Sequence, residues 1–498
     1  MAGSDDLAGL SAVELRALVA RRAVSPVEIV EQALSQAEAT QSHLNCFTVL
    51  TPEPAMVAAR AAEAAVMKGE PLGPLHGLPL SVKDLIAVGG LPYCSGSRAM
   101  RDNVAAADAP SVERVKAAGA ILIGKTTTSE FGCKPVGDSP LTGITRHPWD
   151  ETKTPGGSSA GAAASVLAGI TPLALGTDGG GSLRIPASLC GLVGFKATFG
   201  RVPVWPVSAT PTLAHVGSLA RTVRDAALLT GVMAGFDARD AFSVKDAVPD
   251  FLGACETSPK ELRVAFSPTL GYARPEPDVL VAVETAVAAL GDAGAVIERV
   301  DCVFETDPID LWMAEFYAGV GTRLRTVVET QRELLDPAVA DVLEAALGQD
   351  LRGYYESVFR RYALRDTMRE FFERFDLLVT PTLPVSSVPV GCNVPPQCAD
   401  RNLISWASYT YPFNLTGQPG LSLPAGVGAD GMPVGLQIIG RLHGEADVLR
   451  AASAIEARPP RLARYERPGS PHLAKLLLEP GSFDPSPDTT AAHSTGET

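Results

Sequence analysis

Two glycine-serine loops carry the most information in this chain: Thr154-Pro155-Gly156-Gly157-Ser158-Ser159-Ala160-Gly161 and Gly176-Thr177-Asp178-Gly179-Gly180-Gly181-Ser182-Leu183-Arg184. An alanine-rich segment follows the first loop at once, which places two hydroxyls at the N-terminus of a predicted helix. In the second loop, three glycines let the backbone curve so that successive N–H groups point into one concavity beside the serine. Taken alone, each loop is also typical of an ordinary helix cap or a flexible turn.

A lysine upstream of both loops supplies a third candidate group. Lys83 follows the apolar stretch Leu78 to Val82, which is predicted to be a buried strand. Burial disfavours the charged form of a lysine and lowers its pKa toward a value that suits a base, although most lysines extend to solvent. A serine hydroxyl needs such a base to become a nucleophile, and acyl transfer needs donors aimed at the developing oxyanion. The order of the three segments therefore indicates a serine hydrolase that uses lysine instead of histidine.

Helix and strand signals alternate along most of the chain, which favours an α/β fold with a mixed, twisted central sheet and helices on both of its faces. Helices are predicted near residues 11–22, 25–37, 54–67, 111–118, 158–167, 223–233 and 277–290. Strands are predicted at 78–82, 376–380 and 433–440, and near Ile121, Leu173, Val193 and Val264.

The chain is predicted to divide into an N-terminal helical segment (1–70) that packs on the core, a catalytic domain (71–480) and a disordered tail (481–498). The tail has almost no apolar side chains to offset its ordering entropy. Residues 300–375 are predicted to be a helical insert, rich in charge and aromatic rings. This insert is a candidate cap over a pocket, although ordinary helix packing explains its aromatic residues as well.

Composition limits the partners. The 498 residues carry 42 Lys+Arg against 56 Asp+Glu, a formal net charge of −14, which argues against nucleic acid and anionic membranes. Neither a signal peptide nor an apolar run long enough to span a bilayer is evident, so we expect a cytoplasmic protein. The eight cysteines show no paired CxxC spacing, so neither a disulfide framework nor a metal site is expected.

These motifs together resemble the amidase signature family, whose members hydrolyse amides and related acyl bonds with a Ser, cis-Ser, Lys triad. Lys83 lies 99 residues before Ser182 and Ser158 lies 24 before it, as is typical of that family. The resemblance covers nearly the whole chain except the tail and residues 300–375. It also includes Gly124-Lys125-Thr126, Glu130-Phe131, Gly191-Leu192-Val193-Gly194-Phe195-Lys196 and the PVGLQIIGR segment that ends at Arg441.

The resemblance implies a role for each site residue. Ser182 would be the nucleophile, Ser158 the bridging serine after a cis peptide bond, and Lys83 the base. The oxyanion hole would be formed by the backbone N–H groups of Gly179, Gly180, Gly181 and Ser182. Asp178 and Arg184 flank the nucleophile loop with opposite charges, so we expect them to hold the loop, and the hydroxyls of Ser159, Thr177 and Ser188 are expected to support the site by hydrogen bonds.

Two positions raise questions about the pocket. Gly132 and Cys133 align where relatives line the acyl pocket, although Cys133 fits a small buried hydrophobe equally well. Relatives often carry a side chain where this chain has Gly179, so a more open oxyanion loop is expected. Pocket shape is expected to depend on residues 300–375 and 395–415, including Trp406, Tyr409 and Tyr411.

The implied activity is that of a stand-alone hydrolase of carbon-nitrogen bonds in small aryl or alkyl amides, without metal or cofactor. Carbamates and esters would react by the same acyl-enzyme chemistry, and a homodimer is suggested by the resemblance alone. The alternative within the family is the glutamine-hydrolysing subunit of a tRNA-dependent amidotransferase. The stretch 206–217 departs from what that subunit is expected to contain.

Two rival interpretations of the sequence fail. The stretch Gly119 to Thr126 matches the letters of a P-loop, but its variable residues Ala-Ile-Leu-Ile are themselves a predicted strand, which leaves no loop to surround a phosphate. A histidine triad fails because the histidines lie in unrelated contexts and no G-x-S-x-G motif surrounds Ser182. We interpret His215 as a packing residue, with a place in the pocket wall as the alternative.

Overall fold

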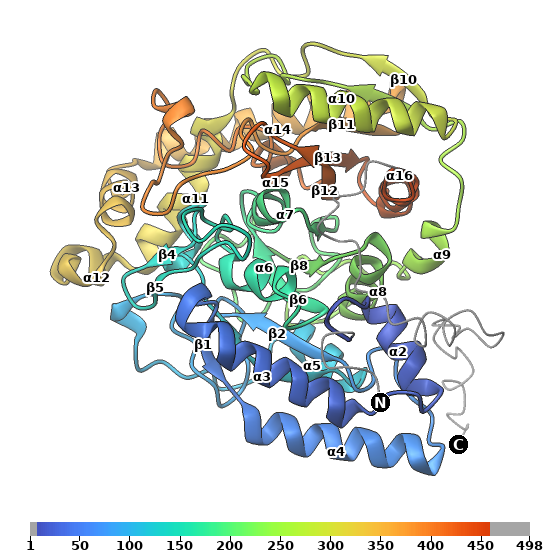
Figure 1. The fold of residues 1–498 in the computed structure, drawn as a ribbon. Coiled ribbons are helices and arrows are strands. Elements are labelled where there is room, and N and C mark those ends of the chain that lie inside the picture. The colour runs from blue at the N-terminus through green and yellow to red at the C-terminus, as the bar shows by residue number, and fades with distance from the viewer. Residues whose placement is uncertain (1–6, 459–498) are drawn as a thin grey trace, which may run out of the picture.

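The centre of the molecule is a mixed sheet of eleven strands, in a computed structural model that describes residues 7–458 (Figure 1). The strand order is β1-β3-β2-β6-β8-β7-β12-β13-β11-β9-β10. The strands are β1 (Phe47–Leu50), β2 (Pro79–Lys83), β3 (Ile121–Thr126), β6 (Leu173–Asp178), β7 (Val193–Lys196), β8 (His215–Ala220), β9 (Arg263–Phe266), β10 (Val296–Arg299), β11 (Leu377–Pro381), β12 (Gly420–Val427) and β13 (Pro433–Gly440). A separate small sheet pairs β4 (Asp138–Ser139) with β5 (Gly143–Ile144).

Strand pairing is parallel between β2 and each of β3 and β6, and between β9 and each of β10 and β11; the other pairs of the large sheet are antiparallel. The α-helices are α2 (Ala12–Ala20), α3 (Pro26–Leu44), α4 (Pro52–Lys68), α5 (Pro110–Ala117), α6 (Ala160–Leu167), α7 (Arg184–Cys190), α8 (Val223–Met233), α9 (Phe251–Cys255), α10 (Pro277–Asp292), α11 (Ile309–Arg323), α12 (Arg325–Thr330), α13 (Pro337–Leu347), α14 (Leu351–Arg374), α15 (Pro412–Thr416) and α16 (Glu445–Glu456).

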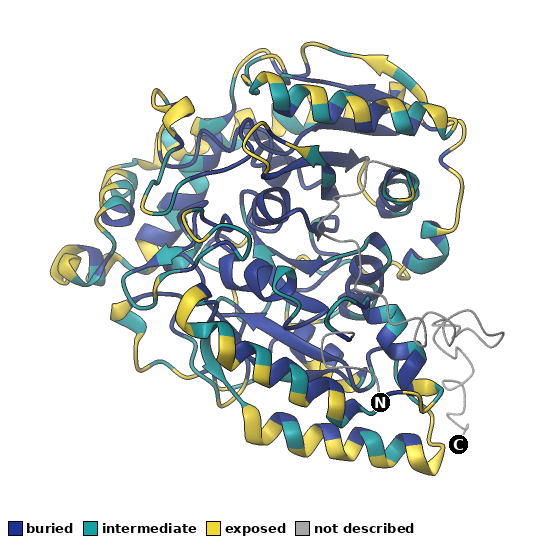
Figure 2. Ribbon diagram, in the orientation of Figure 1, coloured by how far each residue is buried: buried dark blue, intermediate teal, exposed yellow. Residues whose placement is uncertain are grey.

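Helices cover both faces of the sheet. Successive side chains of a strand point to opposite faces, so neighbouring residues pack against different helices. On β6, Leu173 and Leu175 join a large apolar cluster with residues of α8, α10 and α16, whereas Ala174 packs with α6 and α7. Figure 2 shows the central strands fully buried, while the outer faces of α3, α4 and α10 are exposed. The predicted α/β architecture is confirmed.

The predicted helices correspond to observed ones, with ends shifted by up to a few residues at most sites. At α2, Ser11 and Glu14 form the expected capping box. At α3, the helix continues to Leu44, well beyond the predicted end at residue 37. The stretch that matches a P-loop contains β3, so the strand interpretation is correct there.

The sequence patterns did not predict the strands β1, β8, β10 and β12 of the large sheet, nor the two-residue strands β4 and β5. Strand β1 is short, and β12 contains glycine and proline, which depress strand propensity.

Among the described residues, no helix is both long and apolar enough to cross a membrane. The predicted tail, 481–498, lies outside the described residues, and the division of the chain at residue 70 stays a prediction.

The segment 300–375 contains α11 to α14. Figure 1 shows α12 and α13 together at the edge of the molecule opposite to α8, α9 and α16. The aromatic residues of this segment divide into two sets. Trp312, Phe316 and Tyr317 on α11 are buried, whereas Tyr354, Tyr355, Phe359 and Tyr362 on α14 are exposed.

Candidate active site

Lys83 is the last residue of β2, and it projects toward α6. Two residues earlier, the hydroxyl of Ser81 is hydrogen-bonded to that of Ser165 on α6 (3.0 Å), and side chains two apart on a strand share a face. The Lys83 Nζ atom lies 2.7 Å from Ser158 Oγ, 2.9 Å from Ser159 Oγ and 2.8 Å from Thr177 Oγ1. The structure therefore brings together residues that lie up to 94 positions apart in the sequence.

No carboxylate in the described part of the chain forms a salt bridge with Lys83, although its side chain is fully buried. Burial lowers the pKa of Lys83 well below its ordinary value near 10.5, and the negative charge of Asp178 only partly opposes this shift. The nearby buried Lys125 differs, because its Nζ atom lies 2.9 Å from a carboxylate oxygen of Asp84. Lys83 is thus surrounded by hydroxyls where an ordinary buried lysine has a counter-ion.

The first glycine-serine loop carries a cis peptide bond between Gly157 and Ser158, as the resemblance implies. Gly157 passes so close to Val136 that an added Cβ atom would lie 2.3 Å from the Val136 carbonyl oxygen, so only glycine fits. Ser159 is the N-cap residue of α6, but its hydroxyl caps no backbone N–H group. It donates instead to the carbonyl oxygen of Thr177 (3.2 Å), which directs its lone pairs to Lys83.

The second loop follows β6 and places Ser182 just before α7. One of the four predicted oxyanion donors is already engaged, because the N–H group of Gly181 donates to Asp178 Oδ1 (2.8 Å). In the described part of the chain, the N–H groups of Gly179, Gly180 and Ser182 have no such partner. The prediction for Gly181 is therefore corrected, since its N–H group is already bonded to the buried carboxylate of Asp178.

Aromatic rings pack against this loop, so the prediction that the loop is more open at Gly179 is wrong. An added Cβ atom on Gly179 would lie 2.8 Å from Phe316, whose ring stacks on that of Trp312 with 4.4 Å between centroids. Trp312 Nε1 donates to the Gly179 carbonyl oxygen (2.8 Å), and Thr410 Oγ1 donates to the Gly180 carbonyl oxygen (2.6 Å). The ring of Phe316 takes the space that a side chain would otherwise fill.

Asp178 and Arg184 form a buried ion pair beneath the loop, with 2.9 Å between Oδ1 and Nη2. Burial alone would raise the pKa of the Asp178 carboxyl, but the charge and hydrogen bonds of Arg184 outweigh it and hold that pKa below its ordinary range. Arg184 also donates to the Thr410 carbonyl oxygen (2.8 Å) and to Gln437 Oε1 (2.7 Å). The pair therefore joins the serine loop to β13.

Ser188, also assigned a supporting role, accepts from the Gly435 N–H group (3.1 Å).

Arg184→Leu is expected to lower the free energy of unfolding by about 3 to 5 kcal/mol, because it leaves the Asp178 carboxylate buried without a cation. Urea denaturation followed by circular dichroism measures this loss. The matched control is Arg369→Leu, which removes an exposed arginine from surface ion pairs and is expected to change the stability far less. Equal losses in the two variants would contradict the structural role given to the buried pair.

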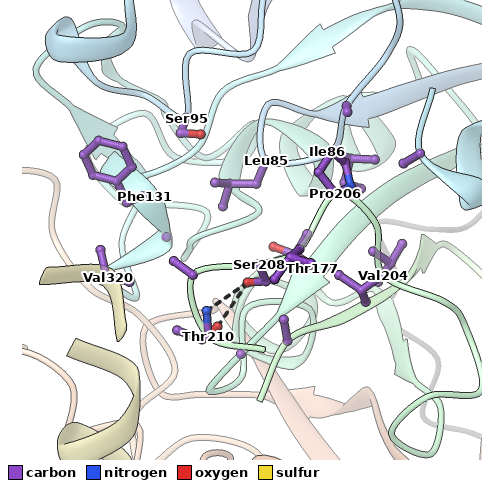
Figure 3. Close-up of a pocket in the computed structure, with 18 of the residues that line it drawn as sticks. Leu85, Ile86, Ser95, Phe131, Thr177, Val204, Pro206, Ser208, Thr210 and Val320 are labelled. Atoms are coloured by element: carbon purple, nitrogen blue, oxygen red, sulfur yellow. Dashed lines mark hydrogen bonds between the residues drawn. The ribbon is translucent and has the colours of Figure 1, made fainter. Parts of the chain in front are cut away.

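A cavity of about 220 Å³ opens in front of the serines. Ser158, Ser182, Gly132 and Gly179 all lie in its wall. Figure 3 shows Phe131 and Val320 on one side of the cavity and Val204 and Pro206 on the other. The polar part of the wall also includes Thr177, Ser208, Thr210, His215, Tyr93, Ser95, Asn103 and Arg323.

Some predicted pocket residues lie elsewhere. Cys133 is buried behind the wall in an apolar cluster, and its carbonyl oxygen accepts from the Tyr317 hydroxyl (3.2 Å). Trp406, Tyr409 and Tyr411 are also buried and do not line the cavity. Their polar atoms bond to Asn393, Pro268 and Asp307, which fixes them in the core.

Other wall residues were not predicted. They come from the segment after β2 and from residues 203–210, whereas the wall residues on α11 belong to the segment 300–375, on which pocket shape was expected to depend. The proline-rich composition of 203–211, directly before His215, was the available signal for an ordered loop at this place. His215 does line the cavity, and it also packs edge-on against Phe199, with 5.4 Å between ring centroids.

The chain is similar to known proteins in both sequence and fold. The sequence profile of the family described as Amidase matches residues 28–449. The chain is 37% identical to an acylamidase of Rhodococcus erythropolis over 91% of its own length and 96% of that relative. It is also 36% identical to a glutamyl-tRNA(Gln) amidotransferase subunit of Chloroflexus aurantiacus, over 91% of this chain and 97% of that relative.

Solved structures agree with the family match. The crystal structure of a bacterial aryl acylamidase of the amidase signature family aligns with a TM-score of 0.86 and 31% identity, over 92% of this chain and 98% of the other. A 6-aminohexanoate cyclic dimer hydrolase aligns with a TM-score of 0.83 and 28% identity, over 92% and 98%. From its sequence and its fold, the chain belongs to the amidase signature family and is an amide-hydrolysing enzyme.

Proposed function

We propose that this chain is a stand-alone amidase in which Ser182 is the nucleophile, Ser158 the bridging serine and Lys83 the base. The observation that carries the proposal is the position of Lys83, fully buried and 2.7 Å from the Ser158 hydroxyl with no carboxylate as its partner among the described residues. Ser158 and Ser182 lie together in the wall of one cavity. A base, a relay and an accessible nucleophile are what acyl transfer requires.

The hydrogen bonds around Lys83 support a transfer of the proton from Ser158 to Lys83. A neutral amine has two N–H donors and one lone pair. Ser159 uses its own hydrogen on the carbonyl oxygen of Thr177, so it can only accept from Lys83. When Thr177 Oγ1 accepts the second N–H, the lone pair of Lys83 is left for the hydroxyl of Ser158.

The proposed cycle has two halves. Lys83 takes the proton of Ser158 while Ser158 takes that of Ser182, and the Ser182 oxygen attacks the amide carbonyl. The backbone N–H groups of Gly179, Gly180 and Ser182 stabilise the oxyanion. The relay then protonates the leaving nitrogen, the C–N bond breaks, and an acyl ester remains on Ser182. Water, deprotonated through the same relay, cleaves this ester.

The cavity favours small amides with aryl or alkyl groups. Its walls are largely apolar, with Leu85, Ile86, Phe131, Val320 and Leu324 among them. Among the described residues that line it there is no aspartate or glutamate to pair with the ammonium group of free glutamine. This disfavours the alternative, a glutamine-hydrolysing subunit of a tRNA-dependent amidotransferase, although the Chloroflexus amidotransferase subunit is similar in sequence.

The test is hydrolysis by the purified chain of a panel of anilides, primary aliphatic amides, carbamates, esters and free glutamine. We expect turnover of anilides or aliphatic amides without added protein. Hydrolysis of glutamine alone, and only after partner subunits are added, would support the alternative. No turnover of any amide under either condition would contradict both functions.

A further inference from the structure

The active-site cavity contains one charged side chain that the proposed mechanism does not use. Arg323 is the only residue of the described wall whose side chain is charged at neutral pH, since the wall holds no other arginine, no lysine and no carboxylate. His215 is also in the wall, but burial first and then the nearby charge of Lys196 lower its pKa well below the ordinary value. Arg323 is therefore the one fixed charge in the described wall of the cavity.

Arg323 has no acidic partner in the described part of the chain, although the protein carries a net charge of −14. Its neighbour Arg325 is, in contrast, paired with Glu329 at 2.7 Å. Arg323 Nη1 donates to the carbonyl oxygen of Val207 (3.1 Å), and this bond connects the end of α11 to the wall loop 203–210. This bond uses one of five N–H donors, and the others remain available for an anion.

The position of Arg323 on α11 sets its distance from the chemistry. Phe316, Val320 and Arg323 follow one another on the face of α11 that lines the cavity. Phe316 packs on Gly179 of the oxyanion loop, and Phe316 and Val320 are buried while Arg323 is exposed. Because a helix rises about 1.5 Å per residue, Arg323 lies about 10 Å from Phe316 along the axis, at the cavity mouth.

A second donor lies near this cation. Tyr93 is in the cavity wall, and its hydroxyl makes no hydrogen bond to a described residue. Burial and then the charge of Asp84 raise the pKa of Tyr93, while the charge of Arg323 opposes them. The hydroxyl therefore keeps its proton at neutral pH and can donate to an anion that Arg323 attracts.

We propose that Arg323 and Tyr93 bind a carboxylate of the substrate, so that the preferred substrates are amides with a carboxylate on the order of 10 Å from the scissile carbonyl. This inference rests on the proposed function and narrows its substrate class. The competing explanation is structural: a cation suits the C-terminus of α11, and the bond to Val207 would only hold the loop. A structural role would affect charged and uncharged substrates equally.

The test compares matched substrates that differ in charge. The para-nitroanilide of octanoic acid and the mono-para-nitroanilide of suberic acid differ only at the end of the acyl chain. The octanoyl amides of para-aminoacetophenone and para-aminobenzoate place the same contrast on the leaving group. For at least one pair, we expect kcat/KM of the wild type to be about tenfold higher with the carboxylate, mainly through KM.

The variants are R323Q, R323K and Y93F, with R325Q as the control for loss of an arginine nearby. R323Q is expected to lower the charged-to-uncharged ratio about tenfold, Y93F by a smaller factor, and R323K is expected to retain part of it. The ratio should also fall as salt is added, because the site is at the exposed mouth. R325Q is expected to keep the wild-type ratio.

Different results of these assays would contradict the carboxylate site and the amidase function. Hydrolysis of the uncharged members with no preference for a carboxylate in either pair would overturn the inference and leave the amidase function intact. A preference that R323Q leaves unchanged would also overturn it. No hydrolysis of any of these amides, nor of the broader amide panel, would contradict the proposed function and the inference together.

Discussion

Ser182→Ala is expected to lower kcat for an anilide substrate by about 10⁴-fold or more, with a smaller change in KM. The alanine removes the oxygen that would form the acyl ester, while the backbone N–H groups of the loop remain in place. The rate is measured by release of the aniline. Mass spectrometry after treatment with a fluorophosphonate checks the same point, because only the wild type is expected to gain a covalent adduct at residue 182.

Ser208 provides a matched control, since it lies in the same wall but its hydroxyl accepts from the Thr210 N–H group (3.1 Å) and contacts no proposed catalytic residue. Ser208→Ala is expected to stay within about tenfold of the wild-type rate. If Ser182→Ala retained a rate comparable with that of Ser208→Ala, another residue would have to be the nucleophile.

The pH dependence of kcat/KM is expected to rise with pH through the lowered pKa of Lys83 and then level off. The sign follows from the charge: protonated Lys83 cannot accept a proton, and the neutral form becomes available as pH increases through the pKa. Because burial holds this pKa well below 10.5, the rise should be complete well before an ordinary lysine titrates. Lys83→Met is expected to lower kcat by about 10³-fold or more and to remove the rising limb.

A second buried lysine makes a control necessary. Burial first, and then the positive charge of Arg184, lower the pKa of Lys196 to about 7. Its Nζ atom lies 3.5 Å from Nε2 of His215, which is in the cavity wall, so its titration could imitate that of the base. Lys196→Met is expected to keep the rising limb. Loss of the limb in Lys196→Met but not in Lys83→Met would contradict the assignment of the base.

The local patterns of the sequence, taken in their order, predicted where the candidate chemical groups lie. Lys83 ends an apolar strand, Ser158 and Ser159 precede an alanine-rich helix, and Ser182 follows three glycines; each is a feature of a few consecutive residues. Such features depend on strand period, helix capping and glycine geometry, which act over short distances. The fold class followed for the same reason, from alternating helix and strand signals.

The surroundings of these groups were decided by contacts between distant segments. No local pattern indicates that the Gly181 N–H group bonds to Asp178, or that Phe316 fills the space beside Gly179. The cavity wall likewise joins the segment after β2, the 203–210 loop and α11, which approach one another only after the sheet forms. The segment 300–375 was expected to influence the pocket, but weakly patterned loops have no periodicity to fix their position, so only tertiary packing decided which residues form the wall and that Arg323 is among them.

The sequence by itself determined that this chain has a buried lysine, two serine loops and an α/β sheet to carry them, because these are encoded in short-range periodicity and backbone preference. Only the tertiary structure decided which hydroxyls surround Lys83, which N–H groups remain free for an oxyanion and which side chains form the pocket. Those properties are distances between residues far apart in the chain, and they exist only once the core has packed.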